Sequence, residues 1–144
     1  MIIEPGLESK VEFIIGKREQ NLAHALGIVY TRLERKCVEA TMPVDQRTKQ
    51  PFGVLHGGAS IALAESLASI GGWLNVDESQ YGVVGIEINA NHLRSVKSGK
   101  VLGVATPIHI GRSTQVWDVK VCNANEQIVC VSRCTLAVIQ RQAL

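Results

Sequence analysis

The sequence predicts an α+β fold in which one curved, mostly antiparallel sheet wraps around one long buried helix. Residues 50–76 begin as a polar turn punctuated by glycines and run into a nearly all-apolar helix. Two strand-like runs precede this helix, and four long β-runs with short separators follow it. An apolar helix between two groups of strands is buried most simply when the sheet curls around it.

Length and composition indicate one domain that spans residues 1–144. Hydrophobic residues make up 46% of the chain and aromatic residues only 4%, so the core must be built from Val, Ile, Leu and Ala. The net charge of +2 and the pI near 8.4 are too mild to indicate a nucleic-acid partner.

The four cysteines show neither a Cys-x-x-Cys pair nor the histidine spacing of a zinc site. Cys130 and Cys134 fall in one strand-like run, where four residues span about 13 Å, too far for a disulfide. We therefore expect reduced thiols in a cytoplasmic protein. Glu4, Pro5 and Glu8 interrupt the stretch that a signal peptide needs, and no uncharged run approaches the ~20 residues of a membrane span.

The N-terminal stretch has the weakest pattern. Short apolar groups in residues 7–26, with breaks at Gly16 and Gly27, predict one or two short helical turns. We interpret residues 1–26 as a variable segment that covers the core.

Strand periodicity begins after this segment. Residues 27–35 and 37–44 predict a β-hairpin with a charged turn around Arg35 and Lys36. The polar residues 45–50 then form a loop that leads to the helix.

The start of the helix is marked by glycines. Pro51 and Gly53 break the preceding segment, and Gly57 and Gly58 stand where the helix begins, so Gly57 can offer an unsatisfied backbone N–H at the positive end of the helix dipole. From residue 59 onward, small and aliphatic residues cover every face. This pattern predicts a helix that is buried all round rather than amphipathic.

Glu65 is the one carboxylate on this helix. A lone glutamate within a helix is usually a surface residue or the partner of an arginine, but this helix shows no polar face. Burying a carboxylate in apolar surroundings is costly unless the group is paired or used. Functional use of Glu65 is therefore the favoured interpretation, with Ser69 one turn further on the same stripe. His56 alone would be a structural histidine at a helix entrance.

The second half of the chain consists of four β-runs. They cover residues 83–94, 101–110, 114–123 and 127–139, and their short separators predict hairpins and a mostly antiparallel sheet. Pro107 cannot donate to a ladder, so we expect a bulge or a sheet edge there.

Three motifs give this chain a family resemblance. EATMPVDQRTKQPFGVLHGGASIALAES, followed by VVGIEINANHLRS and HIGRSTQVW, resembles bacterial hotdog-fold acyl-CoA thioesterases. The similar groups are the 1,4-dihydroxy-2-naphthoyl-CoA hydrolases of menaquinone synthesis and the sister group that clears mischarged aryl carrier proteins in enterobactin synthesis. The resemblance runs from about Glu39 to Ile139, whereas residues 1–26 show no such likeness.

The resemblance implies a homotetramer made of two hotdog dimers, an acyl-CoA substrate, and a possible acyl or aryl carrier protein as partner. It implies Glu65 as nucleophile or general base, Gly57 as oxyanion donor, and Gln50 and His56 as assisting residues. Ser69 completes our candidate catalytic set. The coenzyme A contacts of the family map onto Gly85, His92, Leu93, Arg94, Ser95, His109, Ile110, Gly111, Arg112, Ser113 and Thr114.

Thioester hydrolysis suits these residues. It needs an attacking oxygen and donors for the developing oxyanion, but little acid help, because a thiol with a pKa of about 8.5 leaves readily. Gly57 and Glu65 are eight residues apart, roughly 12 Å along a helix, while both must come within about 3 Å of one carbonyl group. We therefore predict a site shared by two subunits around a two-fold axis.

The candidate cations for the coenzyme A phosphates are Arg94, Lys97, Lys100 and Arg112, although hairpin ends are rich in lysine in most proteins. His92 and His109 fit a structural role as well as a ligand-binding one. The four histidines form no metal spacing, and we expect no metal and no cofactor apart from the coenzyme A of the substrate.

Two alternatives to an aromatic acyl-CoA hydrolase remain. One is a broad acyl-CoA or carrier-protein thioesterase with the same fold. The other is a non-catalytic acyl-CoA-sensing module, against which stand the presence of Glu65 and the lack of length for a DNA-binding segment. A hotdog dehydratase is disfavoured because no Asp and His pair stands in the expected place on the helix.

Overall fold

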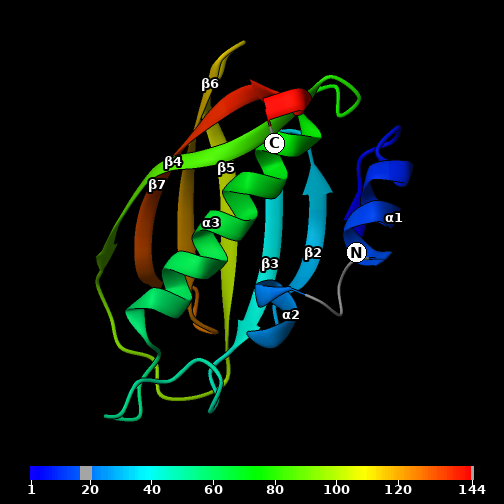
Figure 1. Cartoon of the computed structure of the whole chain (residues 1–144). Helices are drawn as coiled ribbons and strands as arrows, with labels where there is room; N and C mark the ends of the chain where they lie inside the picture. Colours follow the sequence, from blue (N-terminus) through cyan, green and yellow to red (C-terminus); the bar gives the residue numbers. More distant parts are fainter. Residues whose placement is uncertain (17–20, 144) are drawn as a thin grey trace.

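The computed structural model describes residues 1–16 and 21–143 and shows a sheet with helices on one face (Figure 1). In chain order the elements are β1 (Ile2–Ile3), α1 (Glu8–Gly16), α2 (Leu22–Ala25), β2 (Val29–Glu34), β3 (Cys37–Pro43), α3 (Gly57–Leu74), β4 (Tyr81–His92), β5 (Lys100–Ile110), β6 (Thr114–Cys122), β7 (Ile128–Gln140) and a 3-10 turn (Arg141–Ala143). The described strands form one seven-stranded sheet in the order β1-β2-β3-β5-β6-β7-β4. The predicted α+β arrangement of one curved sheet around one long helix is confirmed.

Small residues let α3 lie directly on the sheet. A Cβ atom at Gly71 would come within 2.6 Å of the Trp117 ring, and one at Gly103 of β5 within 2.5 Å of a Leu67 methyl group. Trp117 and Leu67 are fully buried. Glycine is required at both positions because any larger residue would push the helix away from the strands.

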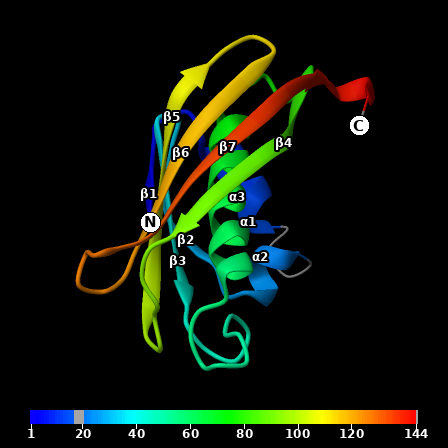
Figure 2. The same cartoon turned by 90° about the vertical axis from the view of Figure 1, so that its left-hand side faces the viewer.

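One expectation about α3 is wrong for the single chain. The helix is not buried all round, because Glu65 and Gly58 are exposed and Ala62 and Ser69 are only half-buried. Figure 2 shows the reason: the sheet covers one side of α3, and α1 and α2 lie on the same face of the sheet beside it. The remaining side has no cover among the described elements of this chain.

The strand pairing follows the prediction in part. β2 and β3 form the predicted antiparallel hairpin, with Glu34 opposite Cys37 across the Arg35 and Lys36 turn. The short β1 pairs with β2 in parallel, which the sequence pattern did not indicate. Every other pairing in the sheet is antiparallel.

The predicted hairpin between residues 83–94 and 101–110 is wrong. β4 pairs with β7 at the edge of the sheet, while β5 pairs with β3 and β6. The connection crosses the end of the molecule because Val96 is buried there and its carbonyl accepts the Leu55 N–H at 2.8 Å. A short separator permits a hairpin but does not impose one. Pro107 lies at a bulge in β5, as one of the two alternatives predicted.

The described residues of the N-terminal segment lie against α3 and β2. Leu7 and Val11 are buried, and the Lys10 ammonium donates to the carbonyls of Trp73 and Val76 at 3.2 and 2.6 Å. Residues 17–20, part of the stretch predicted to form helical turns, lie outside the described residues.

Two further observations concern the chain as a whole. All four cysteines, Cys37, Cys122, Cys130 and Cys134, are free thiols. None of the helices in the described ranges is both long enough and apolar enough to cross a membrane.

Candidate active site

The loop before α3 fixes the start of this helix. Thr48 is buried, its hydroxyl donates to the Pro43 carbonyl at 2.7 Å, and its own carbonyl accepts the His56 N–H at 2.8 Å. His56 has an extended backbone and caps the helix, with its Nδ1 accepting the Gly58 N–H at 2.8 Å. In the neutral ring the hydrogen is therefore on Nε2. His56 thus has the structural capping role and keeps Nε2 as a donor for a ligand.

Gly57 occupies the first turn of α3, as predicted. The first N–H groups of a helix have no partner within the helix, so the Gly57 N–H is open to an acceptor. The His92 ring packs against the position that a side chain would take, since a Cβ at Gly57 would lie 2.8 Å from His92 Nε2. The glycine lets the β4 histidine ring approach closely, and a Cβ at this position would require that ring to shift.

A pocket of about 380 Å³ opens beside this helix start, and it collects many of the predicted site residues. Gln50, Gly57, His92, Leu93, Arg94 and Ser95 line it. The Gln50 Oε1 accepts the Phe52 N–H, so the amide hydrogens of Gln50 are available to a ligand. The Arg94 guanidinium donates to the Ile128 carbonyl at 2.7 Å, which fixes a cation at the pocket wall. The pocket can accept an oxyanion and a negatively charged substrate group.

Glu65 lies on the uncovered side of α3, toward β4. Its Oε1 lies 2.9 Å from the position that a Cβ would take at Gly85, so the glycine makes room for the carboxylate. Burial, together with the nearby Glu65 and Glu87 carboxylates, raises the pKa of the Cys134 thiol to about 11. The structure thus places Gly85 beside the catalytic candidate rather than beside the Gly57 pocket.

α3 is one continuous helix from Gly57 to Leu74. Glu65 and the Gly57 N–H are therefore roughly 12 Å apart along its axis, as the sequence spacing predicts. One chain does not bring these two groups to a single carbonyl.

Apart from Gly85, the predicted coenzyme A contacts fall into two separate groups, residues 92–95 and residues 109–114. His92 pairs with Cys130 on β7, and Thr114 pairs with Ala137. Cys130 and Ala137 are seven positions apart, which is roughly 23 Å at about 3.3 Å per residue. Residues 109–114 therefore lie far from the Gly57 pocket of the same chain.

Ser69 lines a second pocket, of about 700 Å³, between α3, β2 and the N-terminal segment. Ser66 and Tyr30 line it as well, and sequence reasoning did not identify either as a site residue. Ser66 could have been found from its place beside Glu65, whereas nothing in the sequence connects Tyr30 of β2 with α3. Ser60, buried in the Gly57 pocket, was also missed, although it lies one turn from Gly57.

Within residues 1–16 and 21–143, no group of three or more His, Cys, Asp or Glu side chains could hold a metal ion.

A curved, mostly antiparallel sheet around one long helix is the hotdog fold. The chain belongs to the thioesterase superfamily, whose family model matches residues 52–130. It is an enzyme of the thioester hydrolase class.

Relatives whose names state an activity support this assignment. The proofreading thioesterase EntH of Klebsiella pneumoniae is 52% identical over 121 residues, which cover 84% of this chain and 88% of that protein. The 1,4-dihydroxy-2-naphthoyl-CoA hydrolase of Escherichia coli is 48% identical, with the same coverage of both chains. The crystal structure of a mutant of thioesterase PA1618 from Pseudomonas aeruginosa has a TM-score of 0.86 and 45% identity, and covers 94% of this chain and 95% of that chain.

Proposed function

We propose that this protein hydrolyses an aromatic or hydroxyaromatic acyl-CoA to the free acid and coenzyme A. One observation carries the proposal: in a chain of the thioesterase superfamily, the same helix presents Glu65 on its uncovered side and the Gly57 N–H at its start. The relative named 1,4-dihydroxy-2-naphthoyl-CoA hydrolase supports an aromatic acyl group. The place in menaquinone synthesis that we propose rests on the family resemblance of the sequence motifs. The four free thiols support a cytoplasmic protein.

The chemistry needs few groups. The Gly57 N–H donates to the thioester carbonyl oxygen and stabilises the oxyanion, with the Gln50 amide and His56 Nε2 as further donors. Glu65 either attacks the carbonyl carbon to form an anhydride that water then opens, or removes a proton from an attacking water. In both routes a C–O bond forms, the C–S bond breaks, and the thiolate leaves and takes up a proton.

We propose that the site is shared between two chains related by a two-fold axis. The roughly 12 Å between Glu65 and Gly57 excludes a site within one chain. The uncovered side of α3 and the β4 edge strand, 12 residues long, both offer surfaces for a second copy. Glu65 of one chain would then face Gly57, Gln50 and His56 of the partner.

A dimer of such dimers, as the family resemblance implies, would also bring the second group of coenzyme A contacts, residues 109–114, to the Gly57 pocket of another chain. Arg94 and Arg112 would then approach the nucleotide phosphates from different subunits.

An acyl-CoA panel tests the proposed function. With release of free thiol as the measurement, we expect higher kcat/KM for benzoyl-CoA and hydroxynaphthoyl-CoA than for palmitoyl-CoA. A higher kcat/KM for palmitoyl-CoA would move the protein to the general acyl-CoA thioesterases. Release of thiol from none of these substrates would reject the proposed function.

The second candidate is a thioesterase that acts on an aryl carrier protein. The relative named proofreading thioesterase EntH favours it. The same acyl group presented on coenzyme A and on a purified aryl carrier protein separates the two candidates by the ratio of the two kcat/KM values.

A further inference from the structure

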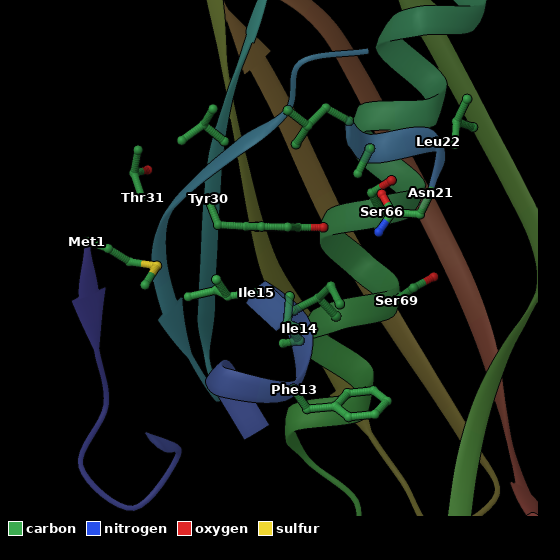
Figure 3. Close-up of a pocket in the computed structure, with 14 residues that line it drawn as sticks. Met1, Phe13, Ile14, Ile15, Asn21, Leu22, Tyr30, Thr31, Ser66 and Ser69 are labelled. Atoms are coloured by element: carbon green, nitrogen blue, oxygen red, sulfur yellow. The ribbon is translucent and has the colours of Figure 1, made fainter. Parts of the chain in front are cut away.

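The pocket that Ser69 lines is formed largely by described residues of the N-terminal segment, chiefly 13–15 and 21–23, by β2 and by one side of α3 (Figure 3). Most of its lining is aliphatic or aromatic, including Ile14, Ile15, Leu22, Ala23 and Ile28. The pocket therefore suits an apolar group rather than the nucleotide or phosphates of coenzyme A.

Residues of α3 next to Glu65 line the pocket, while the Glu65 carboxylate itself lies toward Gly85 of β4 and is not part of the lining. Ser66 follows Glu65 directly in the sequence. Ser69 follows Glu65 by one helical turn, roughly 6 Å along the axis. Both serines line the pocket. Because these two serines follow Glu65 on α3, the acyl group of a thioester held at Glu65 can reach this space along the helix.

Its volume indicates the size of the occupant. A cavity of about 150 Å³ is enough to hold benzene. The pocket here measures about 700 Å³, which exceeds the need of a single benzoyl ring. The pocket therefore has room for a bicyclic aromatic group or for another apolar group of that size.

Hydroxyl groups of the pocket lining can form hydrogen bonds with a bound acyl group. In Figure 3 the Tyr30 side chain extends from β2 across the pocket and ends with its hydroxyl beside α3, on the side of Ser66 and Ser69. Burial raises the pKa of Tyr30 to about 12, so this hydroxyl is protonated and can donate near neutral pH. The Ser66 hydroxyl donates to the Ala62 carbonyl at 2.7 Å, which leaves its oxygen as an acceptor.

We propose that this pocket binds the acyl group of the substrate, and that it selects a hydroxylated aromatic group larger than benzoyl through a hydrogen bond with Tyr30. The inference rests on the proposed thioesterase function and specifies its substrate class. It gives the N-terminal segment a part in specificity, and makes Tyr30 a residue that determines specificity rather than one that acts on the thioester bond.

The size of the pocket is tested with Ala23→Phe, which places a ring in its lining. Ala25→Phe is the matched control, because Ala25 lies on the same short helix but is exposed and outside the pocket lining. The measurement is the ratio of kcat/KM for hydroxynaphthoyl-CoA to that for benzoyl-CoA, which does not depend on how much of each preparation is folded. We expect Ala23→Phe to lower this ratio at least about tenfold and Ala25→Phe to leave it unchanged. An unchanged ratio in Ala23→Phe would overturn the inference, as would an equal fall in both variants.

The hydrogen bond is tested with Tyr30→Phe and a pair of substrates that differ only in the aryl hydroxyl. We expect the preference for hydroxynaphthoyl-CoA over naphthoyl-CoA to fall about tenfold, because the substrate hydroxyl loses its donor. An unchanged preference would remove Tyr30 from specificity. A wild-type protein that hydrolyses none of these thioesters would instead reject the proposed function, so the two failures are distinguishable.

Discussion

Replacing Glu65 with Gln is expected to lower kcat at least roughly a thousandfold on the best acyl-CoA substrate, since an amide neither attacks a carbonyl nor removes a proton from water. Folding should be preserved, because Glu65 is exposed in the chain and substitutions of exposed side chains change stability little. Steady-state kinetics and a thermal melt measure the two effects separately.

Glu87→Gln is the matched control. Glu87 is also exposed, and its carboxylate also contributes to the raised pKa of Cys134, yet it has no place in the proposed chemistry. We expect its activity to stay within about twofold of wild type. If Glu65→Gln kept half of the wild-type activity, Glu65 would have no role in the mechanism.

The second large effect is expected for Gly57→Pro, which deletes the proposed oxyanion donor. Loss of one such donor costs about a hundredfold to a thousandfold in kcat. The fold should tolerate proline, since the first turn of a helix accepts it and the preceding His56 already has the extended backbone that proline requires (ψ 131).

Gly57→Ala distinguishes the loss of the N–H donor from the loss of space that an added Cβ causes. Both variants add a Cβ where the His92 ring packs, but only alanine keeps the N–H. We therefore expect Gly57→Ala to retain far more activity than Gly57→Pro when both are compared by kcat and by thermal unfolding. Equal losses in the two variants would show that contact with His92, and not hydrogen bonding, explains the glycine.

Local patterns were sufficient for the elements that depend on neighbouring residues. The start of α3 at Gly57, the turn at Arg35 and Lys36, and the bulge at Pro107 all follow from residue types within a few positions. The position of β4 did not follow, because its partner β7 is distant in sequence and the connection is held by the buried Val96. Which strands pair depends on packing between distant segments.

The same distinction between features set by neighbouring residues and features set by distant segments applies to the site. Gly57 and Glu65 were identified from their types and spacing on one helix, and the continuous α3 supports the distance between them. The exposure of Glu65 was not predicted, because an apolar pattern does not show whether the cover comes from the same chain or from another. Tyr30 was missed because its relation to α3 arises only when β2 and the helix come together in the fold.

The central claim is that one site uses Glu65 from one chain and Gly57 from another. Its most direct test mixes Glu65→Gln and Gly57→Pro subunits, each inactive alone, and refolds them together in equal amounts. In a mixed dimer one site receives both changes and the other receives neither. Random pairing makes about half of the dimers mixed, each with one working site, so about a quarter of the wild-type activity should return. Mixed dimers confirmed by mass spectrometry that show no recovered activity would contradict the shared site.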